Sequence, residues 1–287
     1  MTKVGVVIDS GVSIPEELRA EYGIEVVPLV TVFGDKLYRD GIELKAPSEL
    51  FRLIAKSDRF PTTSAPSPVD YLASYKKLSK RADSILHVSM SSKLSMSFNS
   101  ATMAKEMAAG ELAGVKIGVL DAMTTVGAAG FIALAAARAG AAGKSLAQVV
   151  KIAKEVRSKV TMIFVMDTLS YLAKSGRIGK AQALMGNMLS IKPIVEIPTS
   201  SGRVEPVTRV RTKAKAVKQL LDIVGQRVGK KPIRIMVEHT AVPEEATKLK
   251  AMVSARFNCV ELLLCEFNPT GAVTIGPGNL GLSFYSD

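Results

Sequence analysis

The sequence predicts an α/β protein in two parts. The first is an N-terminal domain with a mostly parallel sheet, residues 1–158; the second is an α+β domain with a largely antiparallel sheet, residues 159–287. Strand-like apolar runs alternate with helix-like segments up to residue 158, which is typical of parallel strands joined by helices. After residue 160 strand-like runs follow one another, and Ser200, Ser201 and Gly202 form a hairpin turn signal between two of them. We expect a ligand to bind between the two domains.

In the first part, residues 4–8 form a fully apolar strand that ends at the polar corner Asp9-Ser10. Residues 33–42 look like a hairpin, and residues 59–68 form a proline-punctuated loop, because proline cannot continue a helix. Ser145 and Gln148 form a capping box at the start of the last helix. The other expected strands are 24–32, 84–88 and 116–120, and the expected helices are 15–22, 47–56, 71–80, 98–107, 126–142 and 145–158.

In the second part, a short helix over residues 169–178 ends in a Gly-Arg turn. Two longer helices are expected over residues 212–228, capped by Thr212, and over residues 243–256. Cys259 and Cys265 fall in one strand and match no metal or redox spacing, so we interpret them as structural thiols. The expected strands are 161–166, 191–197, 204–210, 233–238, 260–267 and 280–284.

Composition narrows the class of protein. Of the 287 residues, 47% are hydrophobic and 22% are charged, a balance that argues against disorder. The longest apolar run, residues 126–142, contains Arg138 and is shorter than a membrane span. The N-terminus enters a strand without a signal pattern, so we expect a cytoplasmic protein. The net charge of +12 fits an anionic lipid surface or an acidic partner, but the basic residues are dispersed and not interleaved with aromatics, which argues against nucleic acid.

A serine-rich corner follows the expected strand 84–88. Residues 88–100 read VSMSSKLSMSFNS and lead into the expected helix 98–107. Hydroxyls and free backbone N–H groups converge where a strand passes into a helix, an arrangement that suits phosphate or carboxylate. The alternative, that these serines only cap the helix and solvate the loop, stays open. The hydroxyls concerned are those of Ser89, Ser91, Ser92, Ser95, Ser97 and Ser100.

Several familiar motifs fail on inspection. Residues 276–281 match G-x-G-x-x-G, but no strand–helix–strand unit follows them and a proline lies inside. Gly143-Lys144-Ser145 lacks the first glycine of a P-loop. A serine hydrolase would have to use His87 or His239, and His87, beside the serine corner, reads better as a core histidine. No cluster of His, Cys and carboxylates indicates a metal site, and we expect no metal and no cofactor.

Seven segments in order give the sequence a resemblance to the DegV family of bacterial fatty-acid-binding proteins, the acyl-carrier subunits of the fatty acid kinase system. Each segment is weak alone, and together they span essentially the whole chain. They are VIDS (7–10), TTSAPSP (62–68), SSKLSMSFNSA (91–101), LDAMTTVGAAG (120–130), LSYLAKSGRIG (169–179), LSIKPI (189–194) and IGPGNLG (275–281).

The resemblance implies a non-enzymatic carrier that holds a long-chain fatty acid such as palmitate in a buried tunnel. Its carboxylate would be held by Thr63 and Ser95, with Ser92 as a lesser candidate and Arg177 close to the head group. Ser64 and Gly276 would support the pocket. Separately, Arg209 and Arg211 are spaced to face one side of a strand, and could dock a kinase subunit or an anionic membrane surface, or be a solvated basic edge.

The sequence departs from the family pattern at two places. Met96-Ser97 stands where the family usually has Gly-Thr, and Thr274 stands where it has a histidine before G-P-G. Thr274 would then offer a hydroxyl to the carboxylate, and fatty acid binding is better supported than transfer to a kinase. The alternatives are a stand-alone lipid carrier, or a small phosphotransferase or hydrolase that uses the serine corner.

Overall fold

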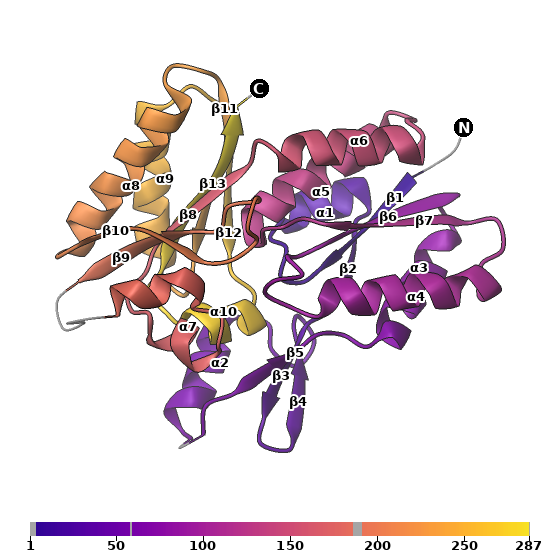
Figure 1. Ribbon diagram of the computed structural model, residues 1–287, viewed down its shortest axis with the longest axis horizontal. Coiled ribbons are helices and arrows are strands. Elements are labelled where there is room, and N and C mark those ends of the chain that lie inside the picture. Colours follow the sequence, from indigo (N-terminus) through magenta and orange to yellow (C-terminus); the bar gives the residue numbers. More distant parts are fainter. Residues whose placement is uncertain (1–3, 58, 186–190, 287) are drawn as a thin grey trace.

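The computed structural model describes residues 4–57, 59–185 and 191–286, and within them the strands form sheets of four, six and three strands (Figure 1). The four-stranded sheet has the order β2-β1-β6-β7, and all its neighbours run parallel, as predicted. Its strands are β1 (Val4–Asp9), β2 (Glu25–Val27), β6 (Ser84–Ser89) and β7 (Lys116–Asp121).

Helices cover both faces of this parallel sheet. α3 and α4 pack on one face; α5 and α6 pack on the other, with α1 beside α5. The capping box of Ser145 and Gln148 is confirmed at the start of α6. These helices are α1 (Glu16–Tyr22), α3 (Pro68–Ser79), α4 (Ser97–Glu111), α5 (Val126–Ala141) and α6 (Leu146–Arg157).

The six-stranded sheet has the order β10-β9-β8-β13-β11-β12, and only the β11–β12 pair is parallel. The largely antiparallel sheet predicted for the second part is therefore confirmed. Helices α8 (Lys213–Val228) and α9 (Pro243–Arg256) pack on one of its faces. Its strands are β8 (Thr161–Val165), β9 (Lys192–Glu196), β10 (Glu205–Val210), β11 (Ile233–His239), β12 (Cys259–Glu266) and β13 (Leu280–Ser286).

Helix α5 lies between the two larger sheets, and this position explains why its sequence is rich in alanine. It packs on β1 and β6 on one side and on β8 and β13 on the other, so most of its side chains are buried. A Cβ atom on Gly130 would lie 2.1 Å from the Ser13 carbonyl oxygen, and one on Gly140 would lie 2.6 Å from that of Val4. These two glycines allow the helix to approach the first part closely, and a Cβ atom on Gly127 would likewise lie 2.8 Å from Glu238 Cδ of β11. One hydrophobic cluster spans both halves. The domain boundary at residue 158 stays a prediction.

The third sheet corrects two expectations. The single strand expected over residues 24–32 is wrong, because Pro28 interrupts it: β2 stays in the parallel sheet and β3 (Val30–Phe33) enters another. The segment 59–68, expected as a loop, contains β5 (Thr62–Ser64). β5 pairs antiparallel with β3, as does β4 (Lys36–Arg39) in the predicted hairpin.

The helices around the cavity described below also differ from expectation. The helix predicted over residues 169–178 is only α7 (Ser170–Lys174), because Gly176 turns the chain with φ +75°, and a 3₁₀ helix, Gly179–Leu184, follows. α10 (Pro269–Ile275) was not predicted; the Asn268 side chain caps it by accepting the Gly271 N–H. α10 packs against α2 (Pro47–Ala55), so the last helix closes on a segment from the first part.

Candidate functional site

An apolar cavity of about 550 Å³ lies where the two parts of the chain meet. Its size falls within the ordinary range of small-ligand pockets, roughly 300–1,000 Å³. Most of its wall comes from one face of the six-stranded sheet, the serine corner and the segments around α7 and α10. The apolar lining includes Met90, Met162, Phe164, Met166, Val195 and Phe267.

Hydroxyl and amide side chains from segments far apart in sequence line the same cavity. They come from β5 and the start of α3, from the serine corner, and from α10. Among the described lining residues, Arg177 is the one with a formal charge, so the cavity combines hydrocarbon walls with hydrogen-bonding groups and one cation. The polar side chains are Thr63, Ser64, Ser67, Ser95, Ser100, Thr125, Asn268, Thr270 and Thr274.

The structure brings together most of the residues singled out from the sequence. Thr63, Ser64, Ser95, Arg177 and Thr274 all line the cavity. Their roles toward a ligand remain predictions.

Two of the expected residues lie outside this set. Ser92 does not line the cavity, and its backbone N–H points to the Asp121 carboxylate, 3.3 Å away. Gly276 does not line it either. It ends α10 with φ +81°, where a Cβ atom would lie 2.6 Å from the Tyr171 ring, so its effect on the cavity is through backbone shape.

The two hydroxyls expected to hold the ligand differ in their surroundings. Ser95 Oγ lies 2.9 Å from Ser97 Oγ and accepts the Ser97 N–H at 3.2 Å, so buried Ser97 fixes its position. Thr63 lies on β5 opposite Thr31, and its hydroxyl makes no hydrogen bond with the described residues. The Thr63 hydroxyl is therefore available to a ligand.

Arg177 is held in place by backbone oxygens rather than by a carboxylate. Its Nε donates to the Leu94 carbonyl at 3.3 Å and its Nη1 donates to the Ser175 carbonyl at 2.5 Å. The first of these bonds joins the segment after α7 to the serine corner, next to Ser95. Because neither acceptor carries a full charge, the guanidinium keeps its positive charge available to an anion in the cavity.

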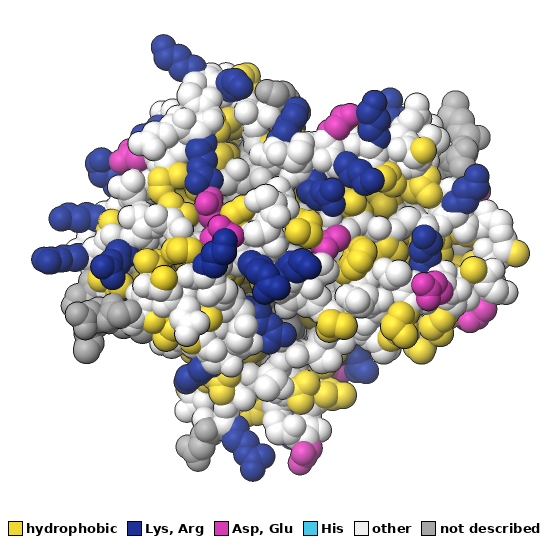
Figure 2. Space-filling view, in the orientation of Figure 1, with side chains coloured by type: hydrophobic (Ala, Val, Ile, Leu, Met, Phe, Trp, Pro, Cys, Tyr) yellow, Lys and Arg dark blue, Asp and Glu magenta, His cyan; other side chains and the backbone are white. Residues whose placement is uncertain are grey.

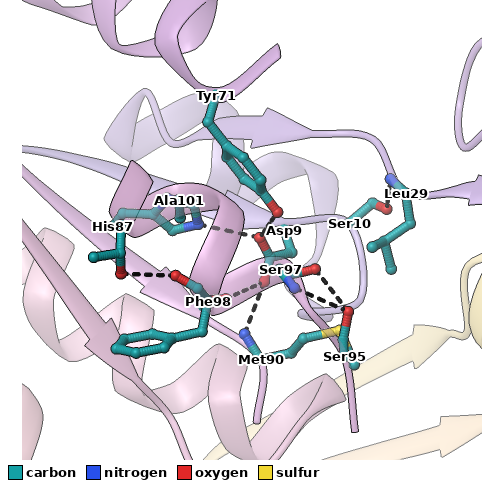
Figure 3. A network of polar contacts seen from close by, with 12 residues as sticks. Asp9, Ser10, Leu29, Tyr71, His87, Met90, Ser95, Ser97, Phe98 and Ala101 are labelled. Atoms are coloured by element: carbon teal, nitrogen blue, oxygen red, sulfur yellow. Dashed lines mark hydrogen bonds and ion pairs between the residues drawn. The ribbon is translucent and has the colours of Figure 1, made fainter. Parts of the chain in front are cut away.

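A buried network behind the serine corner holds the start of that corner (Figure 3). Asp9, at the end of β1, accepts hydrogen bonds from Tyr71 Oη at 2.6 Å, His87 Nε2 at 3.1 Å and the Met90 N–H at 2.8 Å. Burial opposes ionisation of Asp9, but the hydrogen bonds and the proximity of His87 outweigh it and lower its pKa. Both nitrogens of His87 are engaged, since Tyr75 Oη lies 2.8 Å from Nδ1. His87 therefore orients the scaffold and does not reach the cavity.

A second buried carboxylate, Asp40, was missed from the sequence. It accepts the Thr270 N–H at 3.0 Å, the Thr270 hydroxyl at 2.8 Å and the Ser10 hydroxyl at 2.7 Å, and also bonds the Asn268 amide. Burial raises its pKa although these bonds oppose the shift. Asp40, which directly follows β4, thus links the first part of the chain to α10, and α10 carries Thr270 and Thr274. The sequence Asn268-Pro269, which is typical of a helix start, was a signal for α10 but not for Asp40.

The remaining expected sites lie away from the cavity. Arg209 and Arg211 are exposed, at and just after the end of edge strand β10. Within the ranges that the structure describes, no cluster of His, Cys, Asp and Glu could hold a metal ion. No helix in those same ranges has the length and apolar character needed to cross a membrane.

The fold and the cavity define a two-part α/β protein, with one parallel and one mostly antiparallel sheet, that encloses an apolar pocket with hydroxyl groups. The chain belongs to the DegV family: the model of that family, described as an uncharacterised protein family, matches residues 3–287. The family predicted from the sequence is thereby confirmed.

Known relatives match over nearly the full length. A DegV domain-containing protein of Streptomyces coelicolor is 34% identical, over 97% of each chain. Among solved structures, a DegV family protein from Thermus thermophilus, described by its fatty acid binding, superposes with a TM-score of 0.91 at 31% identity, covering 100% of both chains. DegV of Bacillus subtilis, described as a fatty acid binding protein, gives 0.88 at 30% identity, again over 100% of both.

Proposed function

We propose that this chain binds one long-chain fatty acid in the cavity, with the hydrocarbon tail on the apolar lining and the carboxylate among the hydroxyls. The observation that carries the proposal is the lining itself: a cavity of about 550 Å³ with mainly apolar walls, to which Thr63, Ser95 and Thr274 add hydroxyls and Arg177 adds the charge. The relatives from Thermus thermophilus and Bacillus subtilis, described as fatty acid binding, support it.

The free energies explain why both ends of the ligand are needed. A chain of about 14 methylenes gains on the order of 11 kcal/mol when buried, at roughly 0.8 kcal/mol each. Association costs of about 4–15 kcal/mol oppose this gain. The carboxylate therefore must not lose its water without partners, and each hydrogen bond to it contributes about 1.5–3 kcal/mol.

The head-group hydroxyls have defined roles in this proposal. Thr63 and Ser95 donate to the carboxylate oxygens, and Arg177 supplies the compensating charge. Thr274 offers a hydroxyl at the position where the family resemblance places a histidine. The proposal requires no metal and no cofactor beyond the fatty acid itself.

The finer part of the proposal is that the protein presents its fatty acid to a kinase subunit for acyl-phosphate formation, in the cytoplasm. Figure 2 shows Lys and Arg side chains gathered near the middle of one face, where the two parts meet. Such a surface would attract an acidic protein or an anionic membrane. Independently of that surface, Arg209 and Arg211, exposed at and just after the end of edge strand β10, are the proposed docking residues. Thr274 in place of a histidine instead favours a stand-alone carrier.

Catalysis by the serine corner has less support. Among the described lining residues none is a histidine, and Ser95 bonds Ser97 rather than a base. A hydroxyl without a neighbouring base is a weak nucleophile. We therefore propose a carrier rather than an enzyme.

Replacing the two principal hydroxyls tests the binding site. The double variant Thr63→Ala, Ser95→Ala should bind palmitate at least about tenfold more weakly by calorimetry, because the carboxylate loses two partners. Ser79→Ala, whose hydroxyl bonds the Lys76 carbonyl on α3, is the matched control and should bind like the wild type. Native mass spectrometry of protein purified from bacteria should show a bound fatty acid. Unchanged binding by the double variant would remove the head-group assignment, and a protein that neither carries nor binds fatty acid would remove the function.

The kinase question needs a separate assay. Charge reversal at Arg209 and Arg211 should leave palmitate binding unchanged and lower acyl-phosphate formation when the kinase is present. Full acyl-phosphate formation by the variant would assign these residues to a solvated edge, and none by the wild type would favour the stand-alone carrier.

A further inference from the structure

We propose that Phe164, seated over Gly281, is the wall that sets which acyl chains the cavity accepts. The inference rests on the proposed fatty acid binding and names the residues that would determine chain selectivity. Phe164 lines the cavity from β8 and is 2% exposed.

Gly281 of β13 makes room for this ring. The two residues are direct partners in the antiparallel β8–β13 register. A Cβ atom on Gly281 would lie 2.1 Å from Cε1 and 2.3 Å from Cζ of Phe164, inside the space that the ring occupies. The φ of Gly281 is not in the left-handed region, so the need for glycine is spatial. The ring therefore lies across the neighbouring strand because that strand has no side chain there.

Phe267 fixes the ring from the other side. The two rings meet edge to face, with centroids 5.2 Å apart and planes at 89°, and both line the cavity. The Phe267 N–H donates to the His239 carbonyl at 2.9 Å, which anchors its backbone beside the end of β11. Aromatic pairs in this geometry are stabilising, so the wall is a defined surface.

A polar group lies beyond the wall. Glu238 lies on β11, the strand on the other side of β13, directly opposite Gly281. Its buried carboxyl accepts hydrogen bonds from the Gly127 N–H at 2.7 Å and from Ser283 Oγ at 2.5 Å. An acyl chain that extended beyond the position of the Phe164 ring would approach this buried carboxyl, which is unfavourable for a hydrocarbon tail. The ring thus separates the apolar cavity from Glu238, and the tail has to end or turn against it.

Substitutions on the two sides of the contact should shift selectivity in opposite directions. Phe164→Ala adds the volume of the ring to the cavity without reaching Glu238, and should move the preference to longer chains. Gly281→Ala pushes the Phe164 ring toward the cavity that it lines, and should weaken binding of the longest chains most. Each methylene that loses its contact costs roughly fourfold in affinity, equivalent to about 0.8 kcal/mol.

The experiment is competition binding with saturated fatty acids of about 12 to 20 carbons, together with the acyl profile that co-purifies with each variant. Phe131→Leu is the matched control: Phe131 on α5 is also buried and paired with an aromatic ring, that of Tyr285, but it does not line the cavity. It should leave the preference unchanged. Circular dichroism checks folding, and Phe164→Leu replaces Phe164→Ala if the latter does not fold.

The outcomes separate this inference from the function on which it rests. Opposite shifts in the Phe164 and Gly281 variants, with Phe131→Leu unchanged, support the wall. Folded variants that bind fatty acids with the wild-type preference overturn it and leave the proposed function standing. A wild-type protein that binds no chain of any length overturns the proposed function instead.

Discussion

Glu238→Gln should change how the stability of this protein depends on pH. Glu238 lies on β11, is fully buried, and joins the six-stranded sheet to the first turn of α5 through the Gly127 N–H. Burial raises its pKa to about 7, although the bonds with Ser283 and Gly127 act in the opposite direction. Glutamine keeps the carbonyl that accepts the Gly127 N–H and replaces the titrating oxygen with an amide that can donate to Ser283 Oγ.

The direction of the pH dependence follows from the pKa of Glu238 being higher in the folded protein than in the unfolded chain. The ordinary pKa of 4.5 applies to the unfolded chain and about 7 to the folded one, so between these pH values the folded protein keeps a proton that the unfolded chain has lost. The free energy of unfolding therefore falls as pH rises through this window and is level above it. At about 1.36 kcal/mol for each pH unit, the loss is on the order of 3 kcal/mol.

The measurement is urea unfolding of both proteins between about pH 4.5 and pH 8, compared as the difference between them. Other carboxyls with shifted pKa values, such as Asp9, Asp40 and Glu266, are present in both proteins and cancel in that difference. Burial raises the pKa of neighbouring Cys265 above its ordinary value, so this thiol stays protonated in both folded proteins over the range measured. The free energy of unfolding of the variant should therefore increase relative to that of the wild type as pH rises.

A difference between the two unfolding free energies that stays flat from pH 4.5 to 8 would refute the reasoning, since it would mean that Glu238 ionises normally in the folded protein. Glu244→Gln, an exposed change in the first turn of α9, is the control and should show no such trend.

Three further substitutions test the packing around the site. Asp9→Asn should cost about 3–5 kcal/mol in urea unfolding, because donors that now meet a carboxylate would face an amide; a loss below about 1 kcal/mol would contradict the network. Asp40→Asn should weaken palmitate binding by about tenfold or more in calorimetry, because asparagine leaves one acceptor oxygen where Thr270, Ser10 and Asn268 now donate to two; unaltered affinity would separate Asp40 from the site. Gly127→Ala should destabilise by roughly 1–3 kcal/mol, because its Cβ would lie 2.8 Å from Glu238 Cδ, and a neutral result in thermal unfolding would show that the contact relaxes.

Local patterns in the sequence were enough to predict most of the elements. The 3.6-residue period, the caps at Ser145 and Thr212 and the alanine-rich segment each follow from interactions within a few residues, and the structure has the corresponding helices α6, α8 and α5. The sequence did not predict that residues 24–32 divide at Pro28 into two strands of different sheets, because this division depends on the distant strands with which β3 pairs. α10 escaped notice because seven residues give too short a period to recognise.

The cavity shows the same division between local and long-range information. Thr63, Ser95 and Arg177 lie in recognisable segments, so the family resemblance could single them out. Asp40 and Thr270 are 230 positions apart, and only folding shows that their side chains bond. No spacing in the sequence marks a pair of this kind, just as none marks Phe164 as the partner of Gly281.

These long-range bonds explain why the cavity depends on both ends of the chain. Thr63 lies on β5, which pairs with β3, and Thr31 of β3 lies 3.0 Å from Thr270 on α10 through their hydroxyls. Asp40 adds a second link between the same two segments. The proposed head-group hydroxyls of Thr63 and Thr274 therefore come into position only once α10, near the C-terminus, has docked on the small sheet of the first part. A ligand that bridges them would stabilise this junction in particular, since binding stabilises whatever structure it requires.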